Sequence, residues 1–487
     1  MSLSASLTSA FSGLAALSRM TEVVSSNVAN ARTAGYVRRE VMLSSRGADG
    51  AGATVRVSDV RRDVDRALLA DRRGADAGAG AAGRVADFRL SMEQALGAVT
   101  ADGSLTDRIA RLEAALITAS GQPDSETFLG SAVTAARNLA ARISSAAGTV
   151  QAARMSADSR IAEGVATLNS GLQDLADLNE RVRTLTTAGR DATGLMDERQ
   201  QLVDRLSTLV PLREVERSDG QIALFSTSGA ALLDGKPAVV GFTATAQITP
   251  DMTLAGGALS GLTLNGVPVR MDGGAGLLSG GALAADFAIR DTLAPEAQAR
   301  LDGLARDMVE RFSSPTVDPT LASGEAGLFT DAGAAFDPLD ETGLAQRLTV
   351  NAAVDPAQGG AVWRLRDGIN APSPGAAGDA TLLTALSGAL AERRPTASSA
   401  YLAGDRSLAT LGANLVSLTA NDRLEAESDA TMATARQATL TELELQGGID
   451  TDREMQDLLS IEQAYGANAR VVQAVDDLIQ MLLGLGA

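Results

Sequence analysis

Apolar residues recur at alternating steps of four and three positions near the start of the chain. The repeat runs through Leu3, Leu7, Ala10, Leu14, Leu17, Thr21, Val24 and Val28. This spacing puts the apolar side chains on one face of a helix, while serine and threonine fill much of the opposite face. The pattern predicts an amphipathic helix whose narrow apolar stripe needs a partner.

The end of the chain repeats this arrangement. A second stripe runs through Leu458, Ile461, Tyr465, Asn468, Val472, Val475, Ile479 and Leu482. A polar Asn468 within such a stripe can set the register between helices at some cost in stability. Both stripes can simply face the protein's own core. Chain ends are normally poorly packed, however, so a stripe at each end favours pairing of the ends with each other or with neighbouring subunits.

We therefore predict an assembly seam made of apolar residues from both ends. Its members are Leu3, Leu7, Leu14, Leu17, Val24, Leu458, Ile461, Tyr465, Val472, Val475, Ile479 and Leu482. The opposite net charges of the two terminal segments also favour their association. Residues 1–75 carry 11 basic and 7 acidic side chains, whereas residues 422–487 carry 4 basic and 13 acidic ones. Opposite charges favour association, although exposed pairs contribute little energy.

A long helical stretch follows the first segment. Helices are predicted at 85–96 and 105–116, and a much longer one begins near Pro123, with Asp124 as its N-cap. Heptad-like spacing of leucine, isoleucine and valine continues to residue 185. We assign 76–206 to a helical bundle, completed by 286–315 and 401–444, with terminal segments 1–75 and 445–487 pairing beside it.

The periodicity changes at Pro211. Short β-rich runs are separated by the turn dipeptides Asp219-Gly220, Asp234-Gly235 and Asn265-Gly266, so 207–285 is predicted to be an inserted β domain. Residues 316–400, rich in glycine, proline and aspartate, are predicted to be irregular with a few strands. The fold class is therefore mainly α with an inserted β domain: an elongated helical bundle or coiled coil built from both chain ends.

Composition narrows the chemistry. The 487 residues include no histidine, no cysteine and a single lysine, Lys236. The usual zinc ligands, the usual neutral-pH general base and the thiol nucleophile are all missing, so no catalytic residue, metal or cofactor is predicted. A net charge of −18 argues against a nucleic-acid partner. We expect neither a membrane span nor a cleaved signal peptide, because no long apolar run occurs.

Residues 27–39 end the first predicted helix. Asn30 and Gly35 tolerate positive φ, as a helix stop and tight turn require. We define the signature turn as Asn27, Asn30, Thr33, Gly35, Tyr36 and Arg38. By composition alone it is an ordinary helix terminus.

The signature turn resembles the N-terminal motif of flagellar rod, hook and hook-associated proteins, Asn-x-Ala-Asn-x-x-Thr-x-Gly-Tyr. Arg38 fits the hook-associated protein 1 (FlgK) family, whereas Ala34, Val37 and Arg39 depart from its pattern. Three further blocks are similar to that family: 193–199 with Leu202, 280–302, and 448–470. Together the blocks cover nearly the whole chain, with 316–400 the weakest part.

The resemblance implies a structural, extracellular subunit at the hook–filament junction, exported by the flagellar type III apparatus without signal cleavage. It implies a homo-oligomeric ring, contacts with the hook subunit and a second junction protein, and an export chaperone at 445–487. One alternative is a flagellin-like or hook/rod-type axial subunit: the helical stretch at 85–186 disfavours a hook subunit, and flagellin families lack the Gly-Tyr-x-Arg signature. The others are a coiled-coil adhesin and a carboxylate-dependent glycan hydrolase in the β insert. The hydrolase would draw on Glu214, Glu216, Asp219, Asp234, Asp251 and Asp272.

Overall fold

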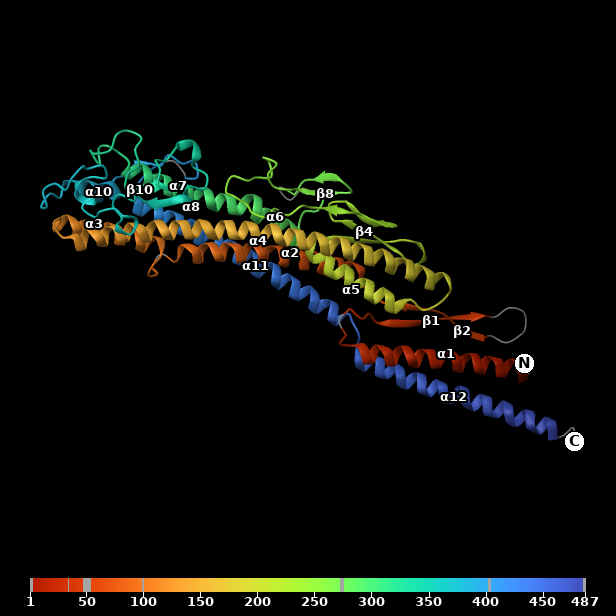
Figure 1. The fold of residues 1–487 in the computed structure, drawn as a ribbon. Helices are drawn as coiled ribbons and strands as arrows, with labels where there is room; N and C mark the ends of the chain where they lie inside the picture. Colours follow the sequence, from red (N-terminus) through yellow and green to blue (C-terminus); the bar gives the residue numbers. More distant parts are fainter. Residues whose placement is uncertain are drawn as a thin grey trace.

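A computed structural model describes residues 3–33, 35–46, 54–98, 100–271, 276–401 and 404–484. The molecule is elongated, with a thick helical body at one end and a thinner arm at the other (Figure 1). The two ends of the chain both lie at the tip of the arm. Helix accounts for 62% of the chain and strand for 11%, which confirms the mainly α class with a β-containing middle.

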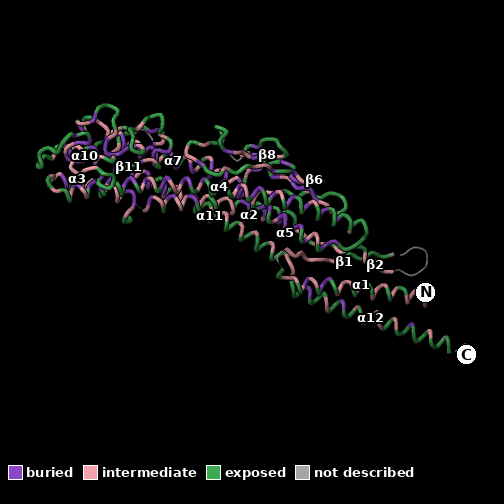
Figure 2. Tube along the Cα trace, viewed as in Figure 1, coloured by how far each residue is buried: buried purple, intermediate pink, exposed green. Residues whose placement is uncertain are grey.

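The arm is built from both ends of the sequence. Helix α1 (Leu3–Asn30) lies beside helix α12 (Thr451–Gly484), and a hairpin of β1 (Arg39–Arg46) and β2 (Thr54–Arg62) lies next to α1 (Figure 1). Most of α12 is exposed, in contrast to the buried interior of the body (Figure 2). No described helix is both long and apolar enough to cross a membrane.

Long helices form the body. They are α2 (Arg66–Leu96), α3 (Leu105–Gly121), α4 (Glu126–Thr187), α5 (Thr193–Leu209), α6 (Gly281–Ala288), α7 (Ala294–Phe312) and α11 (Leu408–Gln446), with a π-helical turn at Ile289–Leu293. Helix α4, with 62 residues, is the longest of these helices and contributes to both hydrophobic cores of the body. Its N-cap is Ser125, whose side chain accepts a hydrogen bond from the Phe128 amide, so the predicted cap at Asp124 was wrong by one residue.

Helix α2 begins earlier than the sequence pattern indicated. It starts at Arg66 behind the N-cap Asp65, whereas we predicted helix only from residue 85 and a segment boundary at 75. Its first half is rich in glycine and alanine, and Ala75 and Ala77 are buried where α2 packs along α11. Small residues allow this packing but leave no pattern of large apolar residues for periodicity to detect.

Two hydrophobic cores lie one after the other along the length of α4. The first joins residues 129–157 of α4 to α3, α7, the start of α11 and the 316–400 region. The second joins residues 161–178 to α5, α6 and the β sheets. Between them Arg290 and Asp158, both almost fully buried, form an ion pair of 2.6 Å. A buried guanidinium needs such a partner, and this pair marks the boundary between the cores.

The β insert contains two small antiparallel sheets. One has β3 (Leu212–Glu216), β4 (Ile222–Ser226), β5 (Ala231–Asp234) and β6 (Lys236–Pro237); the other has β7 (Val240–Gly241), β8 (Leu262–Leu264) and β9 (Val267–Val269). Two predicted turn dipeptides, Asp219-Gly220 and Asn265-Gly266, have positive φ at both residues. This is the backbone that type I′ hairpin turns require, so these two turn predictions are confirmed.

The region 316–400 is more ordered than predicted. It contains short elements, β10 (Phe329–Asp331), α8 (Leu344–Arg347), β11 (Leu348–Val350), α9 (Arg364–Asp367) and β12 (Arg394–Pro395), which pairs with β13 (Asp405–Arg406). It also contains an 11-residue helix, α10 (Thr381–Ala391), which the sequence analysis missed. Leu383 and Leu386 of α10 belong to the first core, so this region packs against the bundle.

Candidate assembly site on the arm

The predicted seam residues lie on the two helices of the arm. Val24, Ile461 and Val475 are buried. Leu3, Leu7, Leu14, Leu17, Leu458, Val472 and Ile479 are partly buried. Tyr465 is 47% exposed, and the side chain of Leu482 lies outside the described residues. The arm therefore brings the N- and C-terminal stripes together along α1 and α12 but leaves much of each side chain accessible.

Asn468, the polar residue within the C-terminal stripe, faces α1. A Cβ added to Gly13 would lie 3.1 Å from the Asn468 Nδ2 atom. The absence of a side chain at Gly13 thus makes room for the Asn468 amide between the two helices. This contact gives the α1–α12 pair one preferred register, because a shift along the helix would press the amide against a larger side chain.

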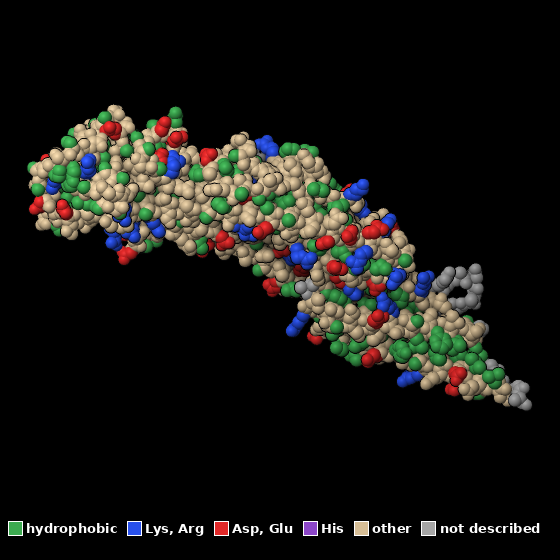
Figure 3. Space-filling model, in the orientation of Figure 1, with side chains coloured by type: hydrophobic (Ala, Val, Ile, Leu, Met, Phe, Trp, Pro, Cys, Tyr) green, Lys and Arg blue, Asp and Glu red, His purple; other side chains and the backbone are tan. Residues whose placement is uncertain are grey.

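A second apolar surface on the arm was missed from the sequence. The exposed large apolar side chains on α1 and α12 include Phe11, Met455, Leu459, Val471, Leu478, Met481 and Leu483. Figure 3 shows hydrophobic side chains gathered over this part of the molecule. These residues lie outside the predicted stripe of each helix. Apolar residues outside that stripe were the available signal for a second contact surface.

The signature turn closes through local hydrogen bonds. The Thr33 amide donates to the Asn30 carbonyl at 2.8 Å, and the Tyr36 amide donates to the Thr33 carbonyl at 3.1 Å. Gly35 has a φ of +77°, and a Cβ at this position would lie 2.4 Å from the Cγ atom of Gln201 on α5. Glycine is required here both by the backbone conformation and by the close approach of the body.

Asn27 is the polar centre of this turn. It is 1% exposed, and its side-chain amide donates to the Arg39 carbonyl at 2.9 Å and to Glu454 Oε2 at 3.0 Å. Its side-chain oxygen accepts from the Arg39 amide and from the Tyr36 hydroxyl, both at 3.1 Å. These four hydrogen bonds, to Arg39, Glu454 and Tyr36, use the full hydrogen-bonding capacity of the Asn27 side chain. Asn27 thereby joins α1, the extended segment and α12.

Arg38 and Glu454 form the second link between the chain ends. The Nε atom of Arg38 lies 2.6 Å from Glu454 Oε1, and Glu454 is 1% exposed. Arg38 also pairs with Glu40 and lies 3.8 Å from Asp457. Burial alone lowers the pKa of Arg38, but the hydrogen bonds that it donates to Glu454 and Glu40 outweigh burial and raise that pKa. Glu454 was within a resemblance block but was not predicted as a site residue.

Asp197 attaches the arm to the body. Its two carboxylate oxygens accept from Arg39 at 2.6 Å and from Arg62 at 2.8 Å, one arginine from each strand of the hairpin. The Arg39 guanidinium also lies 4.6 Å from the centre of the Tyr36 ring. Since Asp197 is on α5, a single carboxylate holds both strands against the body. Arg19 on α1 adds a more exposed pair with Asp191 at 2.8 Å.

Five of the six carboxylates considered for a glycan hydrolase are described; four of them are bound by other side chains, and the fifth, Asp219, lies in the turn between β3 and β4. Glu214, Glu216 and Asp234 are ion-paired with arginines, and Asp251 accepts from Thr249. Asp272 lies outside the described residues. Carboxylates engaged by arginines in this way are suited to holding structure rather than to donating a proton.

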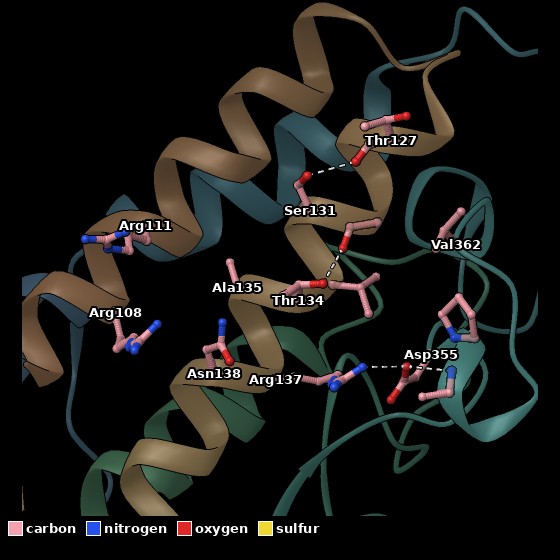
Figure 4. A pocket seen from close by; sticks show the side chains of 14 residues that line it. Arg108, Arg111, Thr127, Ser131, Thr134, Ala135, Arg137, Asn138, Asp355 and Val362 are labelled. Atoms are coloured by element: carbon pink, nitrogen blue, oxygen red, sulfur yellow. Dashed lines mark hydrogen bonds and ion pairs between the residues drawn. The ribbon is translucent and has the colours of Figure 1, made fainter. Parts of the chain in front are cut away.

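A pocket of about 550 Å³ at the far end of the body also lacks the chemistry of a hydrolase. Figure 4 shows its lining, in which Asp355 lies opposite Arg137 at 3.4 Å. Asp355 is the one carboxylate of this lining. Burial raises its pKa, but hydrogen bonds from Gln358 and the Ala357 amide outweigh that effect and leave the pKa below its ordinary value. A general acid needs the opposite shift.

No group of three or more potential metal ligands occurs in the part of the chain that the structure describes. The arm thus has three features: the α1–α12 helix pair, the signature turn held by the hydrogen bonds of Asn27, and the Asp197 carboxylate that binds Arg39 and Arg62. These contacts join α1, the hairpin, α5 and α12.

Comparison with known families matches three parts of the chain. Residues 90–327 match the family model of the flagellar hook-associated protein FlgK helical domain. Residues 446–485 match the C-terminal model of the flagellar basal body rod FlgEFG proteins, and residues 7–36 match that of flagella basal body rod proteins. The two shorter matches coincide with α12 and with α1 and the signature turn.

Individual relatives carry the same description. Flagellar hook-associated protein 1 of Salmonella typhimurium is 26% identical over 238 residues, which cover 47% of this chain and 42% of that protein. Its counterpart in Bacillus subtilis is 24% identical over 352 residues, 66% of this chain and 64% of that protein. The matched part thus spans less than half of the Salmonella relative. A solved structure of the flagellar hook junction protein FlgK from Burkholderia pseudomallei aligns with a TM-score of 0.44 and 19% identity, covering 54% of this chain and 46% of that one.

Proposed function

The chain belongs to the flagellar hook-associated protein 1 (FlgK) family, and we propose on this basis that it is a structural subunit of the bacterial flagellum that joins the hook to the filament. The observation that carries the proposal is the fixed union of the two chain ends. Asn27 and Arg38 from one end both bind Glu454 from the other. This union gives the subunit a defined two-helix arm.

Assembly through the arm explains its unusual surface. The seam residues of α1 and α12 are only partly buried within one copy, and a second apolar surface stays exposed. Burying a large apolar side chain contributes roughly 1.5–3 kcal/mol. Copies arranged in a ring, together with the hook subunit and the second junction protein as axial neighbours, would cover these side chains. The body, attached through Asp197, then lies outside the arm contacts.

The site residues have separate roles in this proposal. Leu3, Leu7, Leu14, Leu17, Val24, Leu458, Ile461, Tyr465, Val472, Val475, Ile479 and Leu482 form the assembly seam. Asn27, Asn30, Thr33, Gly35, Tyr36 and Arg38 shape the turn at the base of α1. Before assembly, residues 445–487 are the binding segment for an export chaperone. The protein acts outside the cell after export by the flagellar type III apparatus.

The proposed role is structural rather than enzymatic. In the described part of the chain, the carboxylates of the β insert are mostly paired with arginines, and the pocket at the far end of the body holds one carboxylate, Asp355. A hook- or rod-type axial subunit is the second candidate, supported by the rod-protein matches at both ends. The match of 90–327 to the FlgK helical domain favours the junction role.

The proposal is tested by a charge placed in the seam. Ile479→Asp introduces a carboxylate at a partly buried position of α12, and Gln473→Asp introduces the same charge at an exposed position. In cells lacking the native protein, we expect the Ile479→Asp chain to be exported into the medium while filaments fail to grow. Gln473→Asp should restore filaments. Normal filaments with Ile479→Asp, or with residues 450–487 removed, would contradict an assembly role for this helix.

A further inference from the structure

A cleft of about 540 Å³ opens where the arm meets the body. Its walls come from β2, the start of α2, the end of α4, α5 and β3, and its lining holds seven arginines but only three acidic residues. Figure 3 shows Lys and Arg side chains, intermixed with Asp and Glu side chains, where the arm meets the body. The positive charge is local, because the whole chain carries a net charge of −18.

Three of these arginines are engaged in ion pairs. Arg62 pairs with Asp197, Arg66 with Glu216, and Arg73 with both Asp204 and Glu214. The remaining four have no carboxylate partner among the described residues: Arg61, Arg190, Arg199 and Arg213. The cleft therefore carries positive charge beyond what the fold itself neutralises.

Arg199 is buried without a carboxylate at ion-pair distance among the described residues, and only the more distant charges of Glu214 and Glu216 act on it. It is 6% exposed, and its Nη1 atom donates only to neutral acceptors, Asn179 Oδ1 at 3.0 Å and the Gly220 carbonyl at 2.7 Å. Burial lowers the pKa of Arg199 to about 10. Nearby, the buried Nη2 atom of Arg73 has no hydrogen-bond acceptor in the described part of the chain. Both guanidinium groups would be stabilised by an added negative charge.

The apolar part of the lining indicates the size of the ligand. Leu69, Met196 and Leu212 lie among the arginines. A small inorganic oxyanion is satisfied by two or three donors and fills only a small part of a cleft of about 540 Å³. A peptide bearing carboxylates can pair with several arginines while its own apolar groups cover the rest.

We propose that this arginine-lined cleft binds an acidic segment of another polypeptide. The carboxylates of that segment pair with the exposed Arg61 on β2, Arg190 after α4 and Arg213 on β3, and their charge also stabilises the buried Arg199. Because β2 belongs to the arm and β3 and α4 belong to the body, the bound segment bridges the two. It thereby reduces their relative motion. This inference does not depend on where the protein assembles.

The test uses the intact purified chain and a fluorescein-labelled octaglutamate peptide, with binding followed by fluorescence anisotropy at low ionic strength. The cleft variant is Arg61→Gln/Arg190→Gln, which removes two exposed side chains without ion-pair partners in the described structure. The matched control is Arg393→Gln/Arg436→Gln, which removes the same charge from exposed positions outside the cleft. We expect the cleft variant to bind about tenfold or more weakly and the control to bind as the native chain does.

Each other outcome overturns the proposal. Absence of binding by the native chain, or an equal loss in the two double variants, would show that no local site exists. Displacement of the peptide by inorganic phosphate far below the concentration of chloride that gives the same ionic strength would show a small-oxyanion site. The overall negative charge of the chain repels octaglutamate, so measurable binding reports the cleft itself.

Discussion

The side-chain amide of Asn27 donates a hydrogen bond of 3.0 Å to Glu454, a residue 427 positions away in the sequence. The same carboxylate accepts from Arg38 at 2.6 Å. Glu454 is buried, so the two bonds replace all contact with water for this charge. The position of α12 relative to the signature turn is therefore specified by one acidic residue.

Glu454→Gln should loosen α12. A glutamine side chain offers one acceptor to two donors, and Arg38 loses its ion pair with the buried position 454. A broken buried charge pair costs about 2–3 kcal/mol or more. Amide hydrogen exchange in residues 451–461 should then accelerate by roughly 30-fold or more if opening is local.

Asp457→Asn is the matched control for that measurement. Asp457 lies 3.8 Å from Arg38 and its side chain is 51% exposed, so its charge contributes little. We expect its exchange rates to stay close to those of the native chain. Equal rates in both variants would mean that the Glu454 carboxylate does not fix α12.

Gly35→Ala should destabilise the base of the arm. The substitution combines a positive φ with a Cβ 2.4 Å from Gln201, at a cost of about 1–3 kcal/mol. Gly466→Ala provides the comparison, because Gly466 is in α12 and an added Cβ would meet no atom within 4 Å. There the same change should be neutral or stabilising by up to about 1 kcal/mol. Thermal unfolding of both variants distinguishes a required glycine from a tolerated one.

Asp197→Asn should weaken attachment of the arm to the body. Asparagine carries no charge for Arg39 and Arg62, and one of these arginines loses its acceptor. The chain has no cysteine, so spin labels can be placed specifically at introduced cysteines, for example at the exposed positions Ser18 and Thr208. The distance distribution between the two labels should broaden in the variant. The distribution should remain narrow with Asp71→Asn, which makes the same substitution at an exposed residue without an ion-pair partner among the described residues. Broadening in both variants would show that Asp197 does not specifically hold the arm to the body.

Asp302 should make the body more stable in mild acid. Burial raises the pKa of Asp302 to about 6 from an ordinary 3.8, despite hydrogen bonds from the Ala345 and Gly343 amides. The folded state therefore binds the Asp302 proton more tightly than the unfolded state does. Burial of the ionised Asp302 carboxylate therefore lowers the free energy of unfolding fully at pH values well above 6. This loss of stability disappears as the pH falls and the carboxylate becomes protonated.

The expected gain from Asp302 between pH 7.5 and pH 5 is roughly 1.4 kcal/mol in the free energy of unfolding, out of a limit of about 3 kcal/mol. Urea unfolding of the native chain and of Asp302→Asn at both pH values isolates this contribution. The variant should lack the gain, whereas Asp340→Asn, at an exposed position nearby in sequence, should retain it. Parallel pH dependence in the native chain and Asp302→Asn would contradict a raised pKa.

Sequence periodicity predicted those elements in which large apolar residues repeat. Residues 161–185 of α4 and the stripes of α1 and α12 are of this kind. The first half of α2 was missed because alanine and glycine pack against α11 without leaving a periodic signal. Helix α10 was missed for a different reason. Leu382, Leu383, Leu386 and Leu390 do follow helical spacing, but the surrounding glycine and proline dominated the interpretation of that region.

The candidate site was only partly accessible to the same reasoning. Gly35 was identified from its tolerance of positive φ, a local property that the structure confirms. The contacts that give the site its rigidity are not local. Neither the bond from Asn27 to Glu454 nor the pairing of Arg39 and Arg62 with Asp197 has a sequence signature, because each depends on how distant segments come together. The family resemblance covers Asp197 and Glu454, which lie in the blocks 193–199 and 448–470, but it does not say which residues bind them.

The central claim is that this chain is the structural junction between hook and filament. It is tested most directly by antibody labelling of isolated hook–basal bodies, examined by electron microscopy. We predict label confined to the distal end of the hook, and no label there when the chain carries Ile479→Asp. Label along the length of the hook or filament, or its absence from the hook tip with the native chain, would contradict the claim.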